Sequence, residues 1–273
     1  MQRPLNFMSR GSSEHYASAN QRDDSDTGWQ RVDAGESPDF TAARPSRFLS
    51  ALPPETFLSV APHLEAVRLN ARAVLWEPNA PIEWAYFPRN AVASITVPLP
   101  HLAGVKAGTV GTEGLVGVPL ILGSDRTASR AVVEVAGDAF RMSADNFRRL
   151  LAEESRFRNF ALRYAQAFLE QVSQSVACNT RHGLRERCAR WLLMTHDRIG
   201  GTEIMLTHSF LAQMLGVRRA GVTVVAGTLQ RDGVITYSRG RVRVLDREAL
   251  ESAACECYGS VAESYNRLLG SAA

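Results

Sequence analysis

The sequence predicts an α+β fold made of three successive parts. Short β-forming runs separated by proline and glycine occupy residues 66–142, one apolar stripe with helical spacing follows at 155–180, and two short helices with a hairpin fill 207–245. The first pattern is typical of an antiparallel sandwich or barrel, and the second of a single long helix. With 273 residues, 45% of them hydrophobic, the chain can bury the core of one or two domains.

Residues 1–45 show no apolar periodicity. They are rich in Ser, Asp, Gly, Arg and Asn, and their large aromatic residues follow no repeat: Phe7, Tyr16, Trp29 and Phe40. Such a composition cannot bury enough apolar surface to offset the entropy of ordering, so we expect a disordered N-terminal arm. One short helical piece is expected after it, at about 47–63.

Residues 46–153 are predicted to form the β-rich domain. Proline and glycine residues separate its short β-forming runs and supply the turns. A helix is expected at 143–152, with Ser143 as its N-cap because the hydroxyl can accept a hydrogen bond from an unpaired backbone N–H. The strands are expected at 67–69, 74–76, 84–87, 92–97, 105–110, 131–135 and 140–142.

Residues 154–181 are predicted to form a long dimerisation helix. Neither glycine nor proline interrupts its apolar stripe, which recurs every three or four positions: Phe157, Phe160, Tyr164, Phe168, Val172 and Val176. A stripe on so long a helix needs a partner surface. The residues alone leave two partners open: the helix docks on its own β domain, or it pairs with its copy in a second chain like a short coiled coil.

Residues 182–250 are predicted to form a winged helix-turn-helix domain. Two short helices that cross steeply need a small residue at the crossing, a residue that tolerates positive φ in the turn, and an apolar residue to fill the gap. Ala212, Gly216 and Val222 meet these needs in that order. Thr207 is expected to cap the first helix, and two alternating runs around a Ser-Arg-Gly turn at 234–245 predict a hairpin, the wing.

The second helix, at about 218–230, would present its N-terminal residues to base edges in the major groove. Arg218, Arg219 and Thr223 fall on that outward turn, and arginine can bond guanine with two parallel hydrogen bonds. We expect phosphate contacts, which position without specifying, from the first helix at Thr207 and Ser209 and from the wing at Arg239 and Arg241.

The charge distribution is compatible with this surface. Residues 182–250 hold eleven arginines and six acidic residues, an excess of 11 − 6 = 5, although the formal charge of the whole chain is only +3. Arginines on such a surface neutralise phosphates and release counterions. An ordinary solvated, arginine-rich surface is an equally good explanation of the charge alone.

These parts, in this order, resemble the cyclic-AMP receptor and fumarate-nitrate regulator (Crp/Fnr) family over about residues 47–250. The most specific segment is 206–245, and the loop at 110–117 with Ala85-Tyr86-Phe87-Pro88 is also similar. The resemblance implies an N-terminal antiparallel β-roll of the cyclic-nucleotide-binding type and a homodimer held by the long helix. It also implies half-sites about 34 Å apart on near-palindromic double-stranded DNA, and RNA polymerase as a partner.

The recognition helix departs from the family pattern. It begins Arg219-Ala220-Gly221-Val222-Thr223-Val224, so it lacks the acid and the second arginine that are frequent in the family. We therefore do not expect the family's familiar operator sequence.

The ligand elements also depart from the pattern. The cyclic-nucleotide cassette of the family uses Gly-Glu for the ribose and Arg-Ser-Ala for the phosphate. The candidates here are Glu113, Arg126 and Thr127. Glu113 precedes Gly114, which reverses the Gly-Glu order of the family, and the gap from Glu113 to Arg126 is longer than usual in the family and mostly apolar. We predict that the domain does not bind cyclic AMP, that its effector is unknown and that it has no cofactor. In the alternative, Glu113 and Arg126 form a structural or surface pair.

The four cysteines predict no metal centre. Iron–sulfur sensors of this family use cysteines ahead of and within the β domain, but the first cysteine here is Cys178. Cys255 and Cys257, in a predicted C-terminal helical extension at 251–273, could form a thiol pair or half a metal site. We interpret them instead as plain small side chains, since the histidines are dispersed without metal-ligand spacing.

A sequence-specific DNA-binding transcription regulator is therefore the favoured function. Enzyme activity is not expected, because P-loop, Gly-x-Ser-x-Gly and zinc-binding histidine motifs are missing from the sequence. The alternative is a cyclic-nucleotide-binding regulatory module that acts on a protein partner, although such a module needs no basic hairpin.

No apolar run reaches the ~18 residues of a membrane span, and no signal peptide is evident. We expect no membrane association, and a cytoplasmic protein with reduced cysteines.

Overall fold

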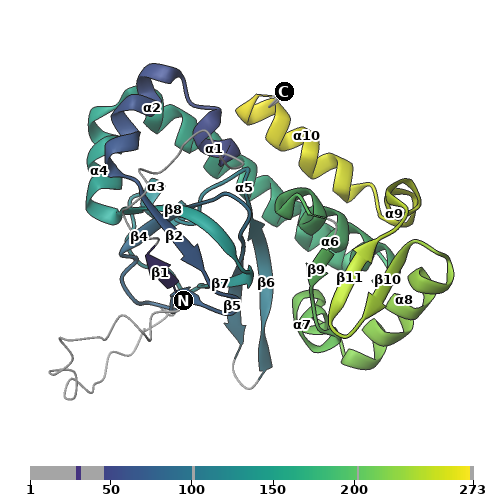
Figure 1. Ribbon diagram of the computed structural model, residues 1–273. Helices are drawn as coiled ribbons and strands as arrows, with labels where there is room; N and C mark the ends of the chain where they lie inside the picture. Colours follow the sequence, from purple (N-terminus) through teal and green to yellow (C-terminus); the bar gives the residue numbers. More distant parts are fainter. Residues whose placement is uncertain (1–28, 32–45, 100–101, 202, 271–273) are drawn as a thin grey trace, which may run out of the picture.

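The computed structural model describes residues 29–31, 46–99, 102–201 and 203–270. A β-rich N-terminal half and a mainly helical C-terminal half are joined by the long helix α5 (Figure 1). Most of the arm predicted at 1–45 lies outside the described residues. Its exception is β1 (Trp29–Arg31), which pairs with β2 (Glu65–Leu69), so the expectation of disorder is wrong for these three residues.

Two four-stranded antiparallel sheets form the N-terminal half. Their strand orders are β1-β2-β8-β4 and β3-β7-β5-β6. Leu69 and Phe87 of the first sheet and Val110 and Val133 of the second are buried in one common core, so the sheets pack face to face as predicted. The remaining strands are β3 (Val74–Trp76), β4 (Trp84–Pro88), β5 (Val92–Leu99), β6 (Leu102–Val110), β7 (Arg130–Val135) and β8 (Gly137–Ser143).

The helices of this half agree with the sequence in part. The helix expected at 47–63 is found as three pieces, and Pro53 and Pro54 separate the first from the second because they disfavour a continuous helix through residues 52–54. Ser143 caps α4 as predicted, since its hydroxyl accepts a hydrogen bond of 3.3 Å from the Asn146 N–H. The helical segments are α1 (Arg47–Ser50), α2 (Pro54–Val60), the 3₁₀ turn η2 (Ala61–His63), α3 (Val118–Ile121) and α4 (Ala144–Glu153).

The aromatic stripe of α5 (Ser155–Arg181) docks on the β domain of its own chain. Phe157, Phe160, Tyr164 and Phe168 are buried in the same core as the two sheets. The Tyr164 hydroxyl also donates a 2.9 Å hydrogen bond to the carbonyl oxygen of Leu115. The sequence left two partners open for this stripe. These four residues pack on the β domain of their own chain, so they cannot form a seam with a second chain.

The C-terminal half has its own core. The helix α6 (Leu184–Ile199) packs with α7 (His208–Leu215), α8 (Arg219–Arg231) and a three-stranded sheet of order β10-β11-β9, around Leu192, Leu211, Val222 and Leu229. The predicted hairpin consists of β10 (Ile235–Ser238) and β11 (Arg241–Val244). The third strand, β9 (Glu203–Met205), was not predicted, because three residues are too few to show an alternating pattern.

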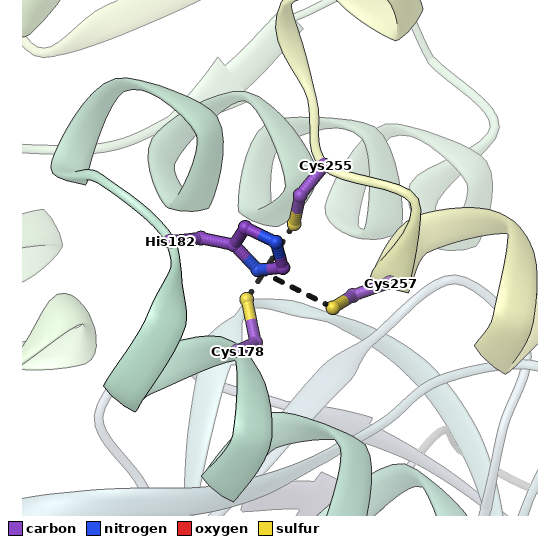
Figure 2. Close-up of side chains that lie close together, drawn as sticks. All are labelled: Cys178, His182, Cys255 and Cys257. Atoms are coloured by element: carbon purple, nitrogen blue, oxygen red, sulfur yellow. Dashed lines mark hydrogen bonds between the residues drawn. The ribbon is translucent and has the colours of Figure 1, made fainter.

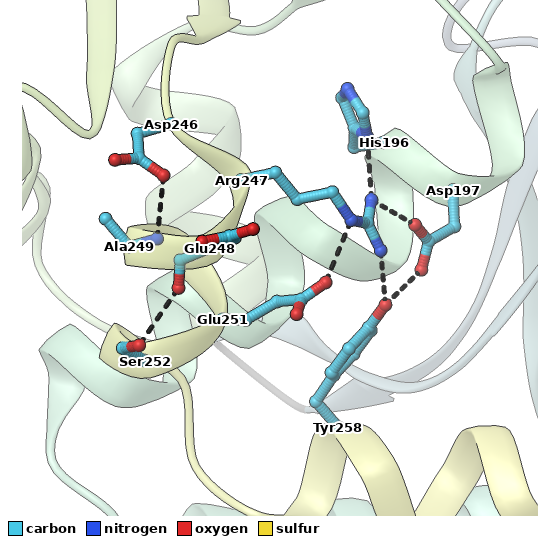
Figure 3. A network of polar contacts seen from close by, with 9 residues as sticks. All are labelled: His196, Asp197, Asp246, Arg247, Glu248, Ala249, Glu251, Ser252 and Tyr258. Carbon is cyan, nitrogen blue, oxygen red and sulfur yellow. Dashed lines mark hydrogen bonds and ion pairs between the residues drawn. The ribbon is translucent and has the colours of Figure 1, made fainter.

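Two further helices, α9 (Arg247–Ala253) and α10 (Cys257–Leu269), follow the hairpin, and α10 folds back along α5 (Figure 1). A polar network ties them to α6 (Figure 3). The Arg247 guanidinium lies 2.7 Å from Asp197 of α6, 2.8 Å from Glu251 and 2.8 Å from the Tyr258 hydroxyl. Burial and the hydrogen bond to Asp197 raise the pKa of Tyr258 to about 12.

In the described part of the chain, no helix is both long and apolar enough to cross a membrane.

Candidate DNA-binding surface and ligand site

The turn between α7 and α8 has the predicted geometry. The Thr207 hydroxyl accepts a 3.2 Å hydrogen bond from the Phe210 N–H and caps α7. Gly216 ends α7 with φ of +64°, a conformation that residues with a Cβ rarely adopt. Ala212 and Val222 are buried where the helices meet. Local sequence chemistry therefore fixes the orientation of α8 relative to α7.

The first turns of α8 present a basic, solvent-exposed face. Arg218 is the N-cap and Arg219 the first helical residue, and both are exposed. Within the described residues neither guanidinium has a hydrogen bond or an ion pair. The unpaired N–H groups at the start of the helix add positive potential. Thr223, one turn further along, is exposed, and its hydroxyl donates a 3.1 Å hydrogen bond to the Arg219 carbonyl oxygen.

His208 supports this face from α7, a role that the sequence did not suggest. Its imidazole stacks on the Tyr237 ring with the ring centroids 4.2 Å apart, and its Nδ1 lies 3.1 Å from the Thr223 hydroxyl. Partial burial and the nearby charge of Arg219 lower the pKa of His208, so the ring is neutral at neutral pH. The sequence shows His208 beside its cap, but only the fold brings Tyr237 of the hairpin to it.

The wing turn is confirmed at Arg239 and Gly240. Both have positive φ, 48° and 76°, which is the pattern of a two-residue type I′ hairpin. Arg239 is exposed at the tip. Arg241 lies 3.8 Å from Glu203 of β9, and Arg243 is also paired with Glu203, so the unpredicted third strand partly neutralises one side of the wing. Ser209 is exposed in the first turn of α7.

Glu113 and Arg126, two of the predicted effector residues, are engaged elsewhere. The Glu113 carboxylate lies 2.7 Å from Nη2 and 2.9 Å from Nε of Arg198 in α6, and both side chains are about nine-tenths buried. Arg198 also donates to the Gln171 side chain of α5 at 3.2 Å. Arg126 donates to the Asn79 carbonyl oxygen at 2.7 Å. The alternative interpretation, a pair of Glu113 with Arg126, is therefore wrong, because the partner of Glu113 is Arg198 of the C-terminal half.

A cavity of about 150 Å³ lies between the sheet β3-β7-β5-β6, the segment 115–119 and α5. Thr127 and Ser129 line it with their hydroxyls, and most other lining residues are apolar, including Trp76, Ile95 and Phe168. Neither Glu113 nor Arg126 is among the described residues of its lining. The cavity thus offers neither an acid for a ribose nor a cation for a phosphate, and only Thr127 of the three predicted residues faces it.

The comparisons with known proteins agree with this architecture. Residues 186–253 match the family described as the Crp-like helix-turn-helix domain. Among solved structures, FixK2 from Bradyrhizobium japonicum is 11% identical, with 70% of this chain and 98% of FixK2 covered and a TM-score of 0.61. The CLP global regulator of Xanthomonas campestris, described as responsive to c-di-GMP, is 17% identical, with coverages of 70% and 99% and a TM-score of 0.55.

A third similar structure is a CRP-family transcriptional regulator from Thermus thermophilus. It is 21% identical, with 68% of this chain and 95% of that chain covered and a TM-score of 0.56. A search of curated proteins found no match to the sequence. Residues 186–253 form a Crp-like helix-turn-helix domain, which is a DNA-binding type of domain. The overall fold is similar to that of solved Crp/Fnr-family structures.

Proposed function

We propose that this regulator reads a near-palindromic operator as a homodimer, with α8 in the major groove and the wing on the flanking backbone. The observation that carries the proposal is the pair of exposed guanidinium groups of Arg218 and Arg219 at the start of α8. Thr223 extends the same face toward base edges. Thr207, Ser209, Arg239 and Arg241 are proposed as phosphate contacts, because they are exposed on the α7 start and the hairpin.

A second face of α5 supports the homodimer. Leu162, Leu169 and Val176 are exposed by 44%, 49% and 62%, and they recur at intervals of seven residues. Gln166 and Ser173, also exposed, lie between them at the alternating three- and four-residue steps of a coiled-coil seam. A second copy of α5 is the occupant we propose for this seam, because two-fold half-sites require a two-fold protein. Of the stripe that the sequence offered as one possible dimer surface, this seam keeps only Val176.

For the effector, we propose a small and largely apolar molecule in the cavity at Thr127, and no cyclic AMP. The proposal is supported by the apolar lining and by the commitment of Glu113 to Arg198. RNA polymerase as a partner and the cytoplasm as compartment are also proposed, on the family resemblance alone.

The test is selection of bound sequences from random duplex DNA with the purified protein. We expect two related half-sites whose centres lie about one helical turn, 10 bp, apart. We also expect affinity for random duplex DNA to fall steeply with salt, as phosphate contacts require. Recovery of no common sequence, together with salt-insensitive binding, would refute the proposal.

A further inference from the structure

Four metal-ligating side chains from two distant segments converge where α5 ends (Figure 2). Cys178 lies in the last turn of α5 and His182 is the C-cap of that helix, while Cys255 and Cys257 stand on either side of Glu256 where α10 begins. Their ligand atoms all lie within 4.8 Å of one another. The three cysteines are buried, and the histidine is half-buried.

We propose that these four side chains bind one Zn²⁺ ion in a tetrahedral Cys₃His site. Zinc–sulfur bonds of about 2.3 Å at tetrahedral angles place two sulfurs about 3.8 Å apart. In the structure, 3.5 Å separate the Sγ atoms of Cys178 and Cys255, and 3.5 Å separate the Cys257 Sγ from the His182 Nδ1. A disulfide needs its sulfurs at about 2.05 Å. Four protein ligands also make a closed site, as structural zinc ions require.

The surroundings favour a metal over a thiol pair. The Nε2 of His182 lies 3.2 Å from the Glu256 carboxylate, which turns Nδ1 toward the sulfurs. Zinc-bound histidines commonly use such a carboxylate to fix their tautomer and orientation. The Gln174 side-chain N–H donates to the Cys257 sulfur at 2.9 Å, which stabilises a thiolate. A disulfide between the two closest cysteines would leave these contacts, and the third cysteine, without a role.

The position gives the ion a structural consequence. His182 stands at the short connection to α6, which begins at Leu184, and Cys257 is the first residue of α10. A bound ion would fasten the α5–α6 connection to the C-terminal helix. The metal site can be tested whether or not the protein binds DNA, so its failure and the failure of the proposed function are distinguishable.

The experiment is a metal titration of the full chain, stripped with a chelator under reducing conditions. Co²⁺ should saturate at one equivalent per chain with intense visible bands of tetrahedral cobalt and thiolate-to-cobalt absorption, and Zn²⁺ should displace it. Cys255→Ser and His182→Asn should lose the thiolate-rich tetrahedral spectrum. Cys188→Ser, which removes a buried cysteine of α6 outside the cluster, should keep it.

A variant of the carboxylate behind His182 separates ligation from folding. Glu256→Gln keeps all four ligands, so it should still bind one equivalent of Zn²⁺, with an affinity about tenfold weaker. Elemental analysis of the untreated wild-type protein gives a readout that needs no variant. A reduced, folded wild-type chain that takes up no stoichiometric Co²⁺ or Zn²⁺, or cobalt bands that survive Cys255→Ser, would overturn the proposal. A Cys178–Cys255 disulfide in the metal-free mass spectrum under the same reducing conditions would overturn it too.

Discussion

The ion pair between Glu113 and Arg198 should hold the β domain and the DNA-binding half together, and its strength can be measured by a double-mutant cycle. Burial alone would lower the pKa of Arg198, but the surrounding groups, chiefly the Glu113 carboxylate with Tyr265 and Asp197, together outweigh it and raise the pKa. The variant Glu113→Leu leaves the buried guanidinium with hydrogen bonds to Met194 and Gln171 but removes the carboxylate in direct contact with it. Removing one partner of a buried pair costs about 3–5 kcal/mol, and these remaining bonds argue for about 3.

The cycle needs the matching single and double variants. Arg198→Met keeps most of the side-chain volume and leaves Glu113 buried without its cation, so a similar loss of about 3 kcal/mol is expected. When both charges are removed, no unpaired ion remains, and the double variant should lose less than about 2 kcal/mol. The losses of the single variants would therefore exceed that of the double variant by about 4 kcal/mol.

Urea unfolding of the full chain, followed by tryptophan fluorescence and far-ultraviolet circular dichroism, measures these free energies. The two probes must report one transition for each variant, so that a single free energy is defined. If the losses of the two single variants sum to the loss of the double variant within about 0.5 kcal/mol, the two side chains act independently. That result would refute the assignment of this pair as the link between the halves.

Three further predictions test other faces of the molecule. Leu169→Glu should give a folded monomer in analytical ultracentrifugation. The control Leu58→Glu, at an exposed leucine of α2, should stay dimeric. If the Leu169→Glu protein is still a dimer, α5 does not form the proposed seam. Arg219→Ala should weaken the binding free energy for the operator by about 1–3 kcal/mol in a fluorescence-anisotropy titration. Arg231→Ala, at the other end of α8, should change that binding free energy little. Equal losses of affinity in the two variants would contradict base reading by the start of α8. Hydrogen bonds from Ser264, Gln166 and Arg267 lower the pKa of Glu170 from 4.5 to about 2. The depressed pKa stabilises the docking of α10 above pH 4.5 and loses this contribution as pH falls toward 2. Between pH 4.5 and 2, amide hydrogen exchange in α10 should increase more in the wild-type protein than in the Glu170→Gln variant. Parallel pH profiles of the two proteins would refute this role of Glu170.

The features predicted correctly are those whose cause lies within a few residues. Gly216 in the left-handed region, the Thr207 and Ser143 caps and the wing turn each follow from local backbone chemistry, and each is present. The positions of the proposed DNA contacts follow from the same local rules, because Arg219 necessarily stands at the start of the helix that Gly216 orients.

The errors concern partners. The spacing from Phe157 to Phe168 correctly predicted a helix with one apolar face, but periodicity carries no information on what covers that face. The β domain of the same chain covers it, and the exposed residues that repeat by seven, such as Leu169, are interrupted by polar residues that hide the repeat. The sequence gives no sign that Arg198 of α6 meets Glu113, because only the packing of α6 against the loop after β6 brings them together.

The metal cluster shows the same limit. Cys255 and Cys257 were recognisable as half a site, but Cys178 and His182 lie one helical turn apart at the far end of α5. That spacing is common in helices without a metal. The fold-back of α10 along α5 (Figure 1) joins the two halves of the cluster, and no pattern in the sequence encodes that packing.

The contacts that the sequence could not supply fix α5 and α6 relative to their neighbours. Glu113 pairs with Arg198, and Lys106, which pairs with Glu134, lies 5.2 Å from the Trp191 ring, so both contacts join α6 to the β domain. The cysteine cluster joins the end of α5 to the start of α10. Because α8 packs on α6 in one core, the angle between α5 and α6 determines where Arg219 lies relative to the proposed seam. A two-fold regulator binds its operator only when its two α8 helices are separated by about 34 Å, one turn of DNA. A signal can therefore change operator affinity without touching α8, provided that it changes the relative stability of two arrangements of the α5–α6 connection.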